Sequence, residues 1–518
     1  MVHAGLARLL ARLDKAGVWR LNPRTQKMEG YFNGGKAGHN CWGVAFDDFA
    51  QVFHKSGDRP DGYCTVPGMV GIPDPDEYNR VGNMFFTNPK TTSLDFIGTR
   101  ALPDDVQGCA LIGGYFGNVV ELHRVQDDRS GFKSEQLPKL LRSISTAFRP
   151  VDVSVGPDGA MYLADWFNPV IGHSQASSAD PERDRTNGRI WRITATGRAG
   201  VKQPDLAGMK PAELPGQLRS SERWTRYQAK QLLFDAPSDE VLKAADAFIA
   251  VENDEHLLLE ICGVFEAHES PRPALLARRL AAKDARVRAY GARVVGNWAD
   301  RLPDALALLG KSIRDGHPRV RLETVVACAH VRKPEAIEVA AQALDSPRDR
   351  FIDYALTQVV KSLKPQFLPV MKQLKLTDAH RAFVTKIATA APMVEHPGKV
   401  VYDMLCLNCH QPTGLGLPGM YPPIAGSEWV TGDTATLIKI VMHGLTGPMK
   451  VNGQDFTQVA PIPMPPMGLD DQQMADVPTY VRSNFGNQSR AVKPAEVKAV
   501  RDASNGRCTF WTPEELRK

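Results

Sequence analysis

The run Cys406-Leu-Asn-Cys-His410 is the feature that most constrains this chain of 518 residues. Two cysteines lie three positions apart, and a histidine follows the second one directly. Side chains three apart share a face of a helix, so both thiols can reach the two vinyl groups of one porphyrin. His410 can then turn its imidazole towards the iron as the proximal ligand. The spacing is the attachment signature of a c-type haem, and it predicts haem c bound through Cys406 and Cys409.

Two other kinds of site use the same residue types. A closed zinc site needs four ligands; the motif would supply three, and Cys508 or His443 a distant fourth. A thioredoxin-like dithiol would follow a strand in a βαβ unit. Residues 400–405 show no such pattern, and a loop rich in glycine and proline follows at 411–423. The sequence therefore favours haem over both alternatives.

A haem iron has a second axial ligand or an open position. Downstream of the motif, residues 461–468 place Met464 and Met467 among four prolines. Proline presets the geometry of such a loop, and Met/His ligation raises the reduction potential of the iron. Either methionine could bind the iron, or both could simply pack against the macrocycle, as methionine does in irregular cores.

The chain then enters a predicted helix. Asp470 with Gln473 three residues later matches a capping box, and apolar residues follow at helical spacing at Met474, Val477 and Val481. We expect these three to face the haem pocket. Pro478 would remove a hydrogen bond inside this helix and crowd the preceding turn, at a cost of roughly 3 kcal/mol. The sequence therefore predicts a kink or a break at Pro478.

Further motifs appear in order along the C-terminal part of the chain: Tyr421-Pro-Pro-Ile-Ala-Gly-Ser427, Met442-His-Gly-Leu-Thr-Gly-Pro448, Val451-Asn-Gly-Gln454, Met464-Pro-Pro and Thr479-Tyr-Val-Arg482. With the Cys406–His410 run, they resemble the cytochrome c domain of the PVC-type haem-binding CxxCH proteins over residues 396–518. This resemblance favours Met464 over Met467, because Met464 stands first in the Met-Pro-Pro run. A hydrophobic residue is usual in that family where this chain has Pro478.

The first 200 residues are dominated by short β patterns. Val153–Tyr162 and Val44–Phe53 each look like strand, tight turn and strand. Val18-Trp-Arg-Leu21 recurs as Ile190-Trp-Arg-Ile193. Repeated hairpins indicate β-propeller blades of about 40–50 residues each, so residues 1–197 would hold about three or four. The start of the chain is no signal peptide, because arginines interrupt its apolar part. We therefore expect that the recorded start is not the natural one and that earlier blades are missing.

A second set of motifs comprises Asn40-Cys-Trp-Gly43, Phe148-Arg-Pro-Val-Asp152, Gly156-Pro-Asp-Gly159, Asp165-Trp-Phe-Asn-Pro-Val-Ile-Gly-His173 and Gly188-Arg-Ile-Trp-Arg-Ile193. These resemble the propeller of the same family, which is similar to quinone-dependent sugar dehydrogenases. The resemblance implies pyrroloquinoline quinone and calcium as further cofactors. Where the family has Arg-Asn-Pro-Trp-Gly, this chain has His39-Asn-Cys-Trp-Gly43.

Polar residues on two loops of this region are candidates for catalysis. A histidine or aspartate could take a hydroxyl proton as hydride leaves for a quinone. The candidates are Asp165, Asn168, His173 and His39, the last beside Asn40. Asp165 and Asn168 could instead fix a turn through bonds to the backbone, which is the common use of these residue types. Arg185, Arg189 and Arg192 are expected to brace the edges of the blades rather than bind a cofactor.

From 205 to 393 the apolar period changes to that of helices. The segments Asp284–Arg293 and Gly316–Val325 align, with Val287 and Val320 at equivalent positions, and 347–351 looks like a third start. Helix pairs that repeat at this spacing predict a HEAT-like solenoid. We expect Asp284 and Asp345 to cap helices. The arginines of the solenoid are expected on solvated faces and as braces between repeats, and the solenoid itself as a spacer or docking surface.

Composition adds exclusions. Charged residues are 23% of the chain and the net charge is +5, without a basic run interleaved with aromatics, so nucleic-acid binding is not expected. The sequence contains no stretch of 18 or more apolar residues, so no transmembrane helix is predicted. The other six cysteines are scattered, with no framework spacing. Attachment of haem c implies export, so we expect a periplasmic or otherwise extracytoplasmic protein.

The sequence thus predicts a multidomain protein. Its parts are an incomplete β-propeller (1–200), an all-α HEAT-like solenoid (205–393) and an all-α cytochrome c domain (396–518). Its predicted function is electron transfer through haem c, with electrons accepted from a propeller dehydrogenase that oxidises a sugar or alcohol and passed to a redox partner protein. In the alternative, the propeller and solenoid bind a glycan or protein and the haem is a relay or sensor. A half-ring would not enclose a substrate, so we expect the chain as written to lack dehydrogenase activity of its own.

Overall fold

The computed structural model describes residues 17–22, 24, 26–33, 41–56, 61–64, 82–87, 91–171, 180–390, 396–416, 421–456 and 463–517. These residues form two compact units. The first holds the described residues of 17–167 and 187–390, and the second those of 168–186 and 396–517.

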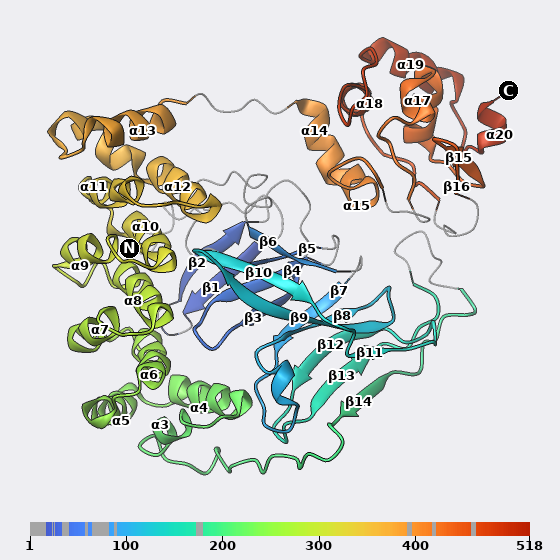
Figure 1. The fold of residues 1–518 in the computed structure, drawn as a ribbon. Helices are drawn as coiled ribbons and strands as arrows, with labels where there is room; N and C mark the ends of the chain where they lie inside the picture. The colour runs from blue at the N-terminus through green and yellow to red at the C-terminus, as the bar shows by residue number, and fades with distance from the viewer. Residues whose placement is uncertain are drawn as a thin grey trace. The chain divides into compact units, whose positions relative to one another are not determined.

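Antiparallel sheets that follow one another along the chain make up the N-terminal part of the first unit (Figure 1). The first pairs β1 (Gly17–Asn22) with β2 (Lys27–Asn33), and the second runs in order through β3 (Cys41–Phe46), β4 (Val52–Ser56), β5 (Asp61–Cys64) and β6 (Asn83–Phe86). The third runs through β7 (Thr91–Phe96), β8 (Ala110–Gly114), β9 (Val119–Asp128) and β10 (Gly131–Gln136), with β11 (Leu141–Arg142) also on β9 and the 3-10 helix η1 (Asp104–Val106) between β7 and β8. The last contains β12 (Pro150–Val155), β13 (Met161–Asp165) and β14 (Arg189–Ile193).

Both predicted hairpins are present. β3 pairs with β4, with Val44 opposite His54, and β12 pairs with β13, with Val153 opposite Leu163. The β3–β4 turn is closed by Asp47, whose Oδ1 accepts from the backbone N–H groups of Phe49 and Gln51, both at 2.8 Å. A short aspartate side chain that bonds forward to the backbone is a common way to fix such a turn.

The first strands of successive sheets lie side by side. β3 packs against β7, and β7 against β12. The approach is closest at Gly43, where an added Cβ would lie 2.6 Å from the Ser93 carbonyl carbon. Consecutive meanders whose first strands adjoin are arranged like propeller blades. The strands in the described ranges form no closed ring, however, so the sheets are confirmed and the propeller is not.

The predicted period change at about 205 is confirmed as a stack of helices (Figure 1). The helices are α3 (Leu214–Gln217), α4 (Arg223–Asp235), α5 (Ser238–Val251), α6 (Glu255–Ala267), α7 (Pro273–Leu280), α8 (Ala285–Asn297), α9 (Ala305–Ser312), α10 (Pro318–Val331), α11 (Ala336–Ala341), α12 (Arg350–Phe367) and α13 (Asp378–Ala388), with the 3-10 turns η2 (Gln342–Asp345) and η3 (Leu368–Gln373). The predicted third start coincides with the beginning of α12.

The aligned repeats occupy equivalent places in α8 and α10. Val287 and Val320 are both buried, each 1% exposed. Asp284 caps α8 as predicted, since its side chain accepts from the Arg286 N–H at 2.8 Å. The prediction for Asp345 is wrong: it ends η2 and pairs with His380 at 2.8 Å, while Asp349 caps α12. The sequence offers two aspartates four residues apart, and only the path of the chain selects the second.

The β3–β4 turn packs on the face of the stack formed by α4, α6, α8, α10 and α12. Arg226 of α4 pairs with Asp48 of the turn at 2.6 Å. Arg293 of α8 donates to Gln51 Oε1 at 3.0 Å and pairs with Glu323 of α10 at 2.5 Å. Arg293 is 6% exposed and Glu323 2%. Arg293 therefore braces neighbouring repeats, as expected of the arginines in the solenoid. However, Arg226 and Arg293 are both buried and do not lie on a solvated face.

The β9–β10 turn meets the same face further along. Arg319 of α10 is buried, donates to the Ser130 carbonyl at 3.2 Å, and stacks over the Phe132 ring at 3.7 Å. Asp349 accepts from the Ser130 N–H at 2.8 Å and from its hydroxyl at 2.7 Å. This face of the solenoid is thus covered by turns of the chain's own sheets.

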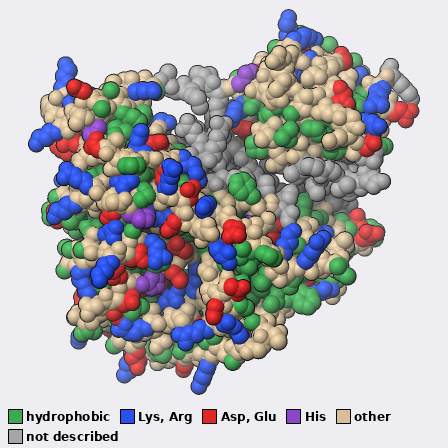
Figure 2. Space-filling model, viewed as in Figure 1, with side chains coloured by type: hydrophobic (Ala, Val, Ile, Leu, Met, Phe, Trp, Pro, Cys, Tyr) green, Lys and Arg blue, Asp and Glu red, His purple; other side chains and the backbone are tan. Residues whose placement is uncertain are grey.

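Figure 2 shows basic and acidic side chains interspersed over the viewed face of the molecule.

The second unit is mainly helical. Its elements are α14 (Pro397–Val401), the π-helical turn η4 (Tyr402–Cys406), α15 (Leu407–His410), α16 (Glu428–Thr431), α17 (Thr434–His443), the hairpin β15 (Met449–Val451) and β16 (Gln454–Phe456), α18 (Asp471–Ser483), α19 (Pro494–Ala503) and α20 (Pro513–Leu516). None of the helices in the described ranges of either unit has both the length and the apolarity to cross a bilayer.

Helix α18 begins where the sequence predicts and continues further than expected. The capping box is present, with the Asp470 side chain accepting from the Gln473 N–H at 2.8 Å. Pro478 lies inside α18, which runs unbroken from Asp471 to Ser483. The predicted break is therefore wrong, and the alternative, a kink at Pro478, stays a prediction. Pro478 is itself buried in the packing of the unit, and this packing offsets the lost helical hydrogen bond.

Helices α14 and α18 cross with almost no space between their backbones. A Cβ built on Gly398 would overlap the Asp476 carbonyl and lie 2.8 Å from the Tyr480 Cβ. Only glycine permits this approach, because the obstructing atoms are main-chain atoms that cannot turn aside.

We expect Gly398→Ala to destabilise the second unit by about 2 kcal/mol or more, since overpacking against a fixed backbone typically costs 1–3 kcal/mol. Urea unfolding followed by circular dichroism would measure the loss. Gly468→Ala is the matched control, because a Cβ there meets nothing within 4 Å. Equal stability of the two variants would contradict the close crossing of α14 and α18.

Candidate functional site

The attachment motif lies on a continuous helical segment. Cys406 ends the π-helical turn η4, and Cys409 and His410 lie on α15 directly after it. π-helical turns are rare and often mark functional positions, because they re-aim side chains relative to a regular helix. The two cysteines and the histidine are thus gathered on one turn of chain, as the three-residue spacing predicts.

His410 is oriented by a hydrogen bond from its Nδ1 to the Pro422 carbonyl, at 3.0 Å. A carbonyl can only accept, so Nδ1 carries the proton and Nε2 keeps its lone pair. Metal-binding histidines are typically held this way, with the second nitrogen donating to a carbonyl. Burial lowers the pKa of His410, which favours the neutral, ligating form. The donor set therefore fits an iron ligated through Nε2.

The chain after His410 turns back sharply to bring Pro422 into place. Gln411 adopts a positive φ of 63° with ψ 164°, a strained conformation for a residue with a side chain. The Tyr402 hydroxyl donates to the Gln411 carbonyl at 2.7 Å, and Gly416 N–H donates to the His410 carbonyl at 3.0 Å. Sequence reasoning missed Pro422 as the partner of His410. The only signal in the sequence that could have pointed to Pro422 is the Tyr-Pro-Pro motif in which it lies.

The thiol environment does not match a redox dithiol. Burial raises the pKa of Cys406 to about 12, whereas dithiol oxidoreductases lower the pKa of the attacking thiol. Burial, together with the neighbouring Cys409, also raises the pKa of Tyr421 to about 12. The Tyr-Pro-Pro motif thus reaches the attachment motif on two sides, through Tyr421 at Cys409 and through Pro422 at His410.

The two candidates for a fourth zinc ligand, His443 and Cys508, are engaged elsewhere. His443 Nε2 bonds to the Ser504 hydroxyl at 2.8 Å, and Cys508 is exposed, with its thiol on the Gly506 carbonyl. Within the described ranges, no three His, Cys, Asp or Glu side chains are gathered as metal ligands.

Both candidate methionines lie against the core of the second unit, and so does Cys406. This C-terminal core consists of Val401, Tyr402, Leu407, Ile424, Val430, Leu437, Ile438, Val441, Met442, Met474, Ala475, Val477, Val481, Val492, Val497 and Val500. The three predicted pocket residues of α18 are members of it. Met464 is fixed by backbone hydrogen bonds to Leu445, and Met467 by one to Val441. The contacts of the two methionines do not decide between them.

In the first unit, Asp165 is 3% exposed and fully engaged. Its Oδ1 accepts from the N–H groups of Arg149 and Phe167, at 2.8 and 2.9 Å, and its Oδ2 accepts from the Trp191 indole at 3.1 Å. Arg192 pairs with Asp158 at 2.6 Å, as expected of a brace at a sheet edge. These contacts match the turn-fixing role for Asp165, and its catalytic role stays a prediction.

Asn168, counted with the second unit, also makes turn contacts. Its Oδ1 accepts from the Val170 N–H at 3.1 Å, and its Nδ2 donates to the Asp184 carbonyl at 3.0 Å. His39, Asn40 and His173 lie outside the described residues. Whether the four catalytic candidates come together therefore stays a prediction.

Sequence reasoning missed a buried titratable pair on β9. Glu121 and His123 are both 0% exposed. Glu121 Oε2 lies 3.2 Å from His123 Nε2 and accepts from Gln136 Nε2 at 3.0 Å. The available signal was their i, i+2 spacing, which places both on one face of a strand.

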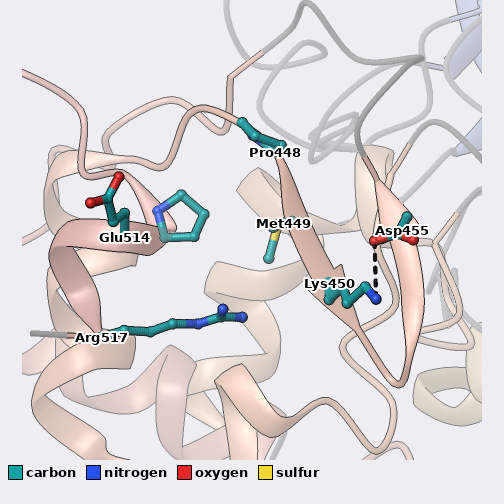
Figure 3. A pocket seen from close by; sticks show the side chains of 7 residues that line it. Pro448, Met449, Lys450, Asp455, Glu514 and Arg517 are labelled. Carbon is teal, nitrogen blue, oxygen red and sulfur yellow. Dashed lines mark ion pairs between the residues drawn. The ribbon is translucent and has the colours of Figure 1, made fainter.

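A surface pocket of 440 Å³ lies in the second unit between the β15–β16 hairpin and α20 (Figure 3). Its rim carries the Lys450–Asp455 ion pair, 3.6 Å apart, and the Arg517 side chain reaches across it. None of the predicted haem ligands lines this pocket.

Three protein families match separate parts of the chain. Residues 83–197 match a domain of unknown function (DUF7133), residues 272–361 match HEAT repeats, and residues 396–485 match cytochrome c. An engineered protein of known structure aligns with 35% of this chain and 95% of its own, at 16% identity and with a low TM-score of 0.22.

Similar curated proteins are cytochromes. The cytochrome c subunit of a quinone alcohol dehydrogenase from Gluconacetobacter polyoxogenes is 30% identical over 29% of this chain and 31% of its own. The gluconate 2-dehydrogenase cytochrome c subunit of Pantoea cypripedii is 32% identical over 24% and 30%. Cytochrome c-552 of Thermus thermophilus is 28% identical over 24% and 83%. The chain thus covers under a third of the dehydrogenase subunits. It contains HEAT repeats and a haem-binding cytochrome c domain, and its cofactor is haem c.

Proposed function

We propose that the cytochrome c domain holds its haem through Cys406 and Cys409, with His410 and Met464 as axial ligands, and relays electrons from a dehydrogenase to a redox partner protein. The observation that carries the proposal is the 3.0 Å hydrogen bond from His410 Nδ1 to the Pro422 carbonyl. It presents Nε2 as a ligand on the same turn of chain as the two thiols. When bound, the haem supplies a one-electron couple of its iron.

The protein's own residues set the conditions for that couple. The C-terminal core removes water from the site, and a low-polarity surrounding disfavours the added charge of ferric iron. The Pro422 carbonyl holds the imidazole in one tautomer and makes it a better donor. A thioether from Met464 would raise the reduction potential, in the same direction as the low-polarity surrounding.

The dehydrogenase is proposed on two grounds. Several cytochrome relatives are named as subunits of dehydrogenases for alcohols, gluconate and fructose. The first unit of this chain carries consecutive meanders with adjoining first strands, a feature that is compatible with propeller blades and supports the proposal. We therefore propose that the sheets belong to a propeller that oxidises a sugar or alcohol with pyrroloquinoline quinone and calcium. Cytochromes c receive their haem outside the cytoplasm, and this supports the proposal that the protein resides in the periplasm or an equivalent compartment.

The haem gives a direct readout of this proposal. Purified holoprotein would be incubated with pyrroloquinoline quinone and calcium, then given aldoses or alcohols while haem absorbance is followed. Reduction that needs both quinone and substrate supports a dehydrogenase within the chain. Reduction only after adding a separate dehydrogenase would place the oxidation in a partner. No reduction under either condition would contradict the relay.

Met464→Ala should abolish the weak far-red band expected of methionine-ligated ferric haem and lower the reduction potential, because the thioether favours ferrous iron. Met467→Ala, three residues along the same loop, is the matched control and should keep both. Absorbance of the ferric protein and a redox titration would measure the two effects. The reverse pattern would assign the ligand to Met467.

A further inference from the structure

The short segment Gly444–Thr446 lies between two distant stretches of chain. On one side, Leu445 forms a two-bond antiparallel bridge with Met464, with N···O distances of 3.1 and 2.9 Å. On the other, a parallel bridge joins it to Trp511: the Trp511 N–H donates to the Gly444 carbonyl at 3.1 Å, and the Thr446 N–H donates to the Trp511 carbonyl at 2.9 Å. We name this three-part arrangement the 464–445–511 ladder.

The ladder is tight. Gly444 has a φ of +80°, and a Cβ there would overlap the Met464 carbonyl and lie 2.6 Å from Phe510 Cδ1. Any side chain at Gly444 would push apart the methionine segment and the tail. Gly444 is therefore in close contact with the Met464 segment on one side and with residues 510–511 on the other.

The tail that contributes Trp511 is itself firmly held. The Arg507 guanidinium stacks 3.5 Å over the Trp511 ring and pairs with both carboxylate oxygens of Glu515 at 3.0 Å. Thr512 and Glu515 form a capping box at the start of α20. Ser504, at the other end of the tail, bonds to His443 at 2.8 Å. The tail, residues 504–517, is thus a fixed support rather than a loose end.

The methionine loop is pinned at a second point, where the Met467 N–H donates to the Val441 carbonyl at 3.0 Å. Pro465 and Pro466 lie between the two pinned methionines, and each fixes its own φ. The position of the Met464 backbone, from which its side chain reaches out, is therefore set by its two hydrogen bonds to Leu445. A thioether is a weak ligand on a flexible side chain, so its binding depends on this support.

We propose that the tail, residues 504–517, is a positioning element that holds Met464 as iron ligand by completing the 464–445–511 ladder. The match to cytochrome c ends at 485, before this tail begins. The inference rests on the proposed ligand Met464. Without the tail, the Gly444–Thr446 segment loses one of its two paired edges, and Met464 moves with it.

The test uses full-length holoprotein with Trp511→Pro, which removes the N–H that bonds to Gly444. We expect the far-red band to be lost, the reduction potential to fall, and added imidazole to bind at least about tenfold more tightly, since methionine no longer competes for the iron. Haem content after denaturation should be unchanged. A chain ending at Ala503 should behave the same way. Retention of the band in either variant overturns the inference.

Thr509→Pro is the control, because its N–H has no acceptor among the described residues. It should keep the band; loss there too would indicate general disturbance of the tail and overturn the ladder's role. If wild-type protein lacks the band, the assignment of Met464 fails first. A band in wild type that survives Trp511→Pro leaves Met464 standing and refutes only the inference.

Discussion

Replacing Cys406 and Cys409 together with serine should convert a haem that survives acidified-acetone extraction into one that is extracted completely. Serine is nearly isosteric but forms no thioether with a vinyl group, so only axial ligation would remain, and acid releases it. Each single variant keeps one thioether and should retain its haem. The measurement is haem absorbance in the denatured protein fraction, after expression with a cytochrome c maturation system.

Cys508→Ser is the control for the double variant, because Cys508 is exposed and outside the motif. It should retain haem as the wild type does. Complete extraction from the wild-type protein would show that the cofactor is not covalently attached at these two positions. Retention by the double variant would place the attachment elsewhere in the chain.

Arg293→Met should destabilise the first unit by about 3–5 kcal/mol, the usual cost of removing one partner of a buried ion pair. It leaves Glu323 charged and buried, 2% exposed, and removes the bond to Gln51 that seats the β3–β4 turn. The change would appear as a lower urea midpoint and as faster hydrogen exchange at residues 47–51.

Two further variants separate the lost pair from a general effect. Arg314 is an arginine of the same stack whose Nε donates to Gln342 at an exposed contact, so Arg314→Met should change stability by less than about 0.5 kcal/mol. Arg293→Met combined with Glu323→Leu should recover part of the loss, because an apolar pair often replaces a buried ion pair at little cost. If the double variant were as unstable as the single one, the lost contact to the turn would account for the whole effect.

The correct predictions from sequence rest on local chemistry. The Asp470 capping box spans four residues, so this pattern contains its own geometry. The spacing from Cys406 to His410 is equally local, and the role of these residues in haem attachment stays a prediction. The hairpin around Asp47 and the 33-residue offset of Val287 and Val320 are short-range or periodic signals of the same kind.

The wrong or undecided predictions depended on packing. Pro478 breaks an isolated helix, yet α18 continues through it where the unit packs around it. Asp345 and Asp349 are equally good caps by type, and only the second lies at a helix start. Arg293 looks like a surface residue in a helical repeat until the turn of a sheet more than 240 residues away covers it.

By itself, the sequence determined that the chain has a cytochrome c domain with haem c, that hairpins form around Asp47 and Asp158, and that strands give way to repeated helices. These properties follow from side-chain spacing along one segment of the chain. Only the tertiary structure decided that Pro422 orients His410, that the solenoid's face is covered by the chain's own turns, and that Trp511 reaches the segment that holds Met464. Each is a contact between backbone groups or buried charges far apart in sequence, and such contacts are selected by packing rather than by any local pattern.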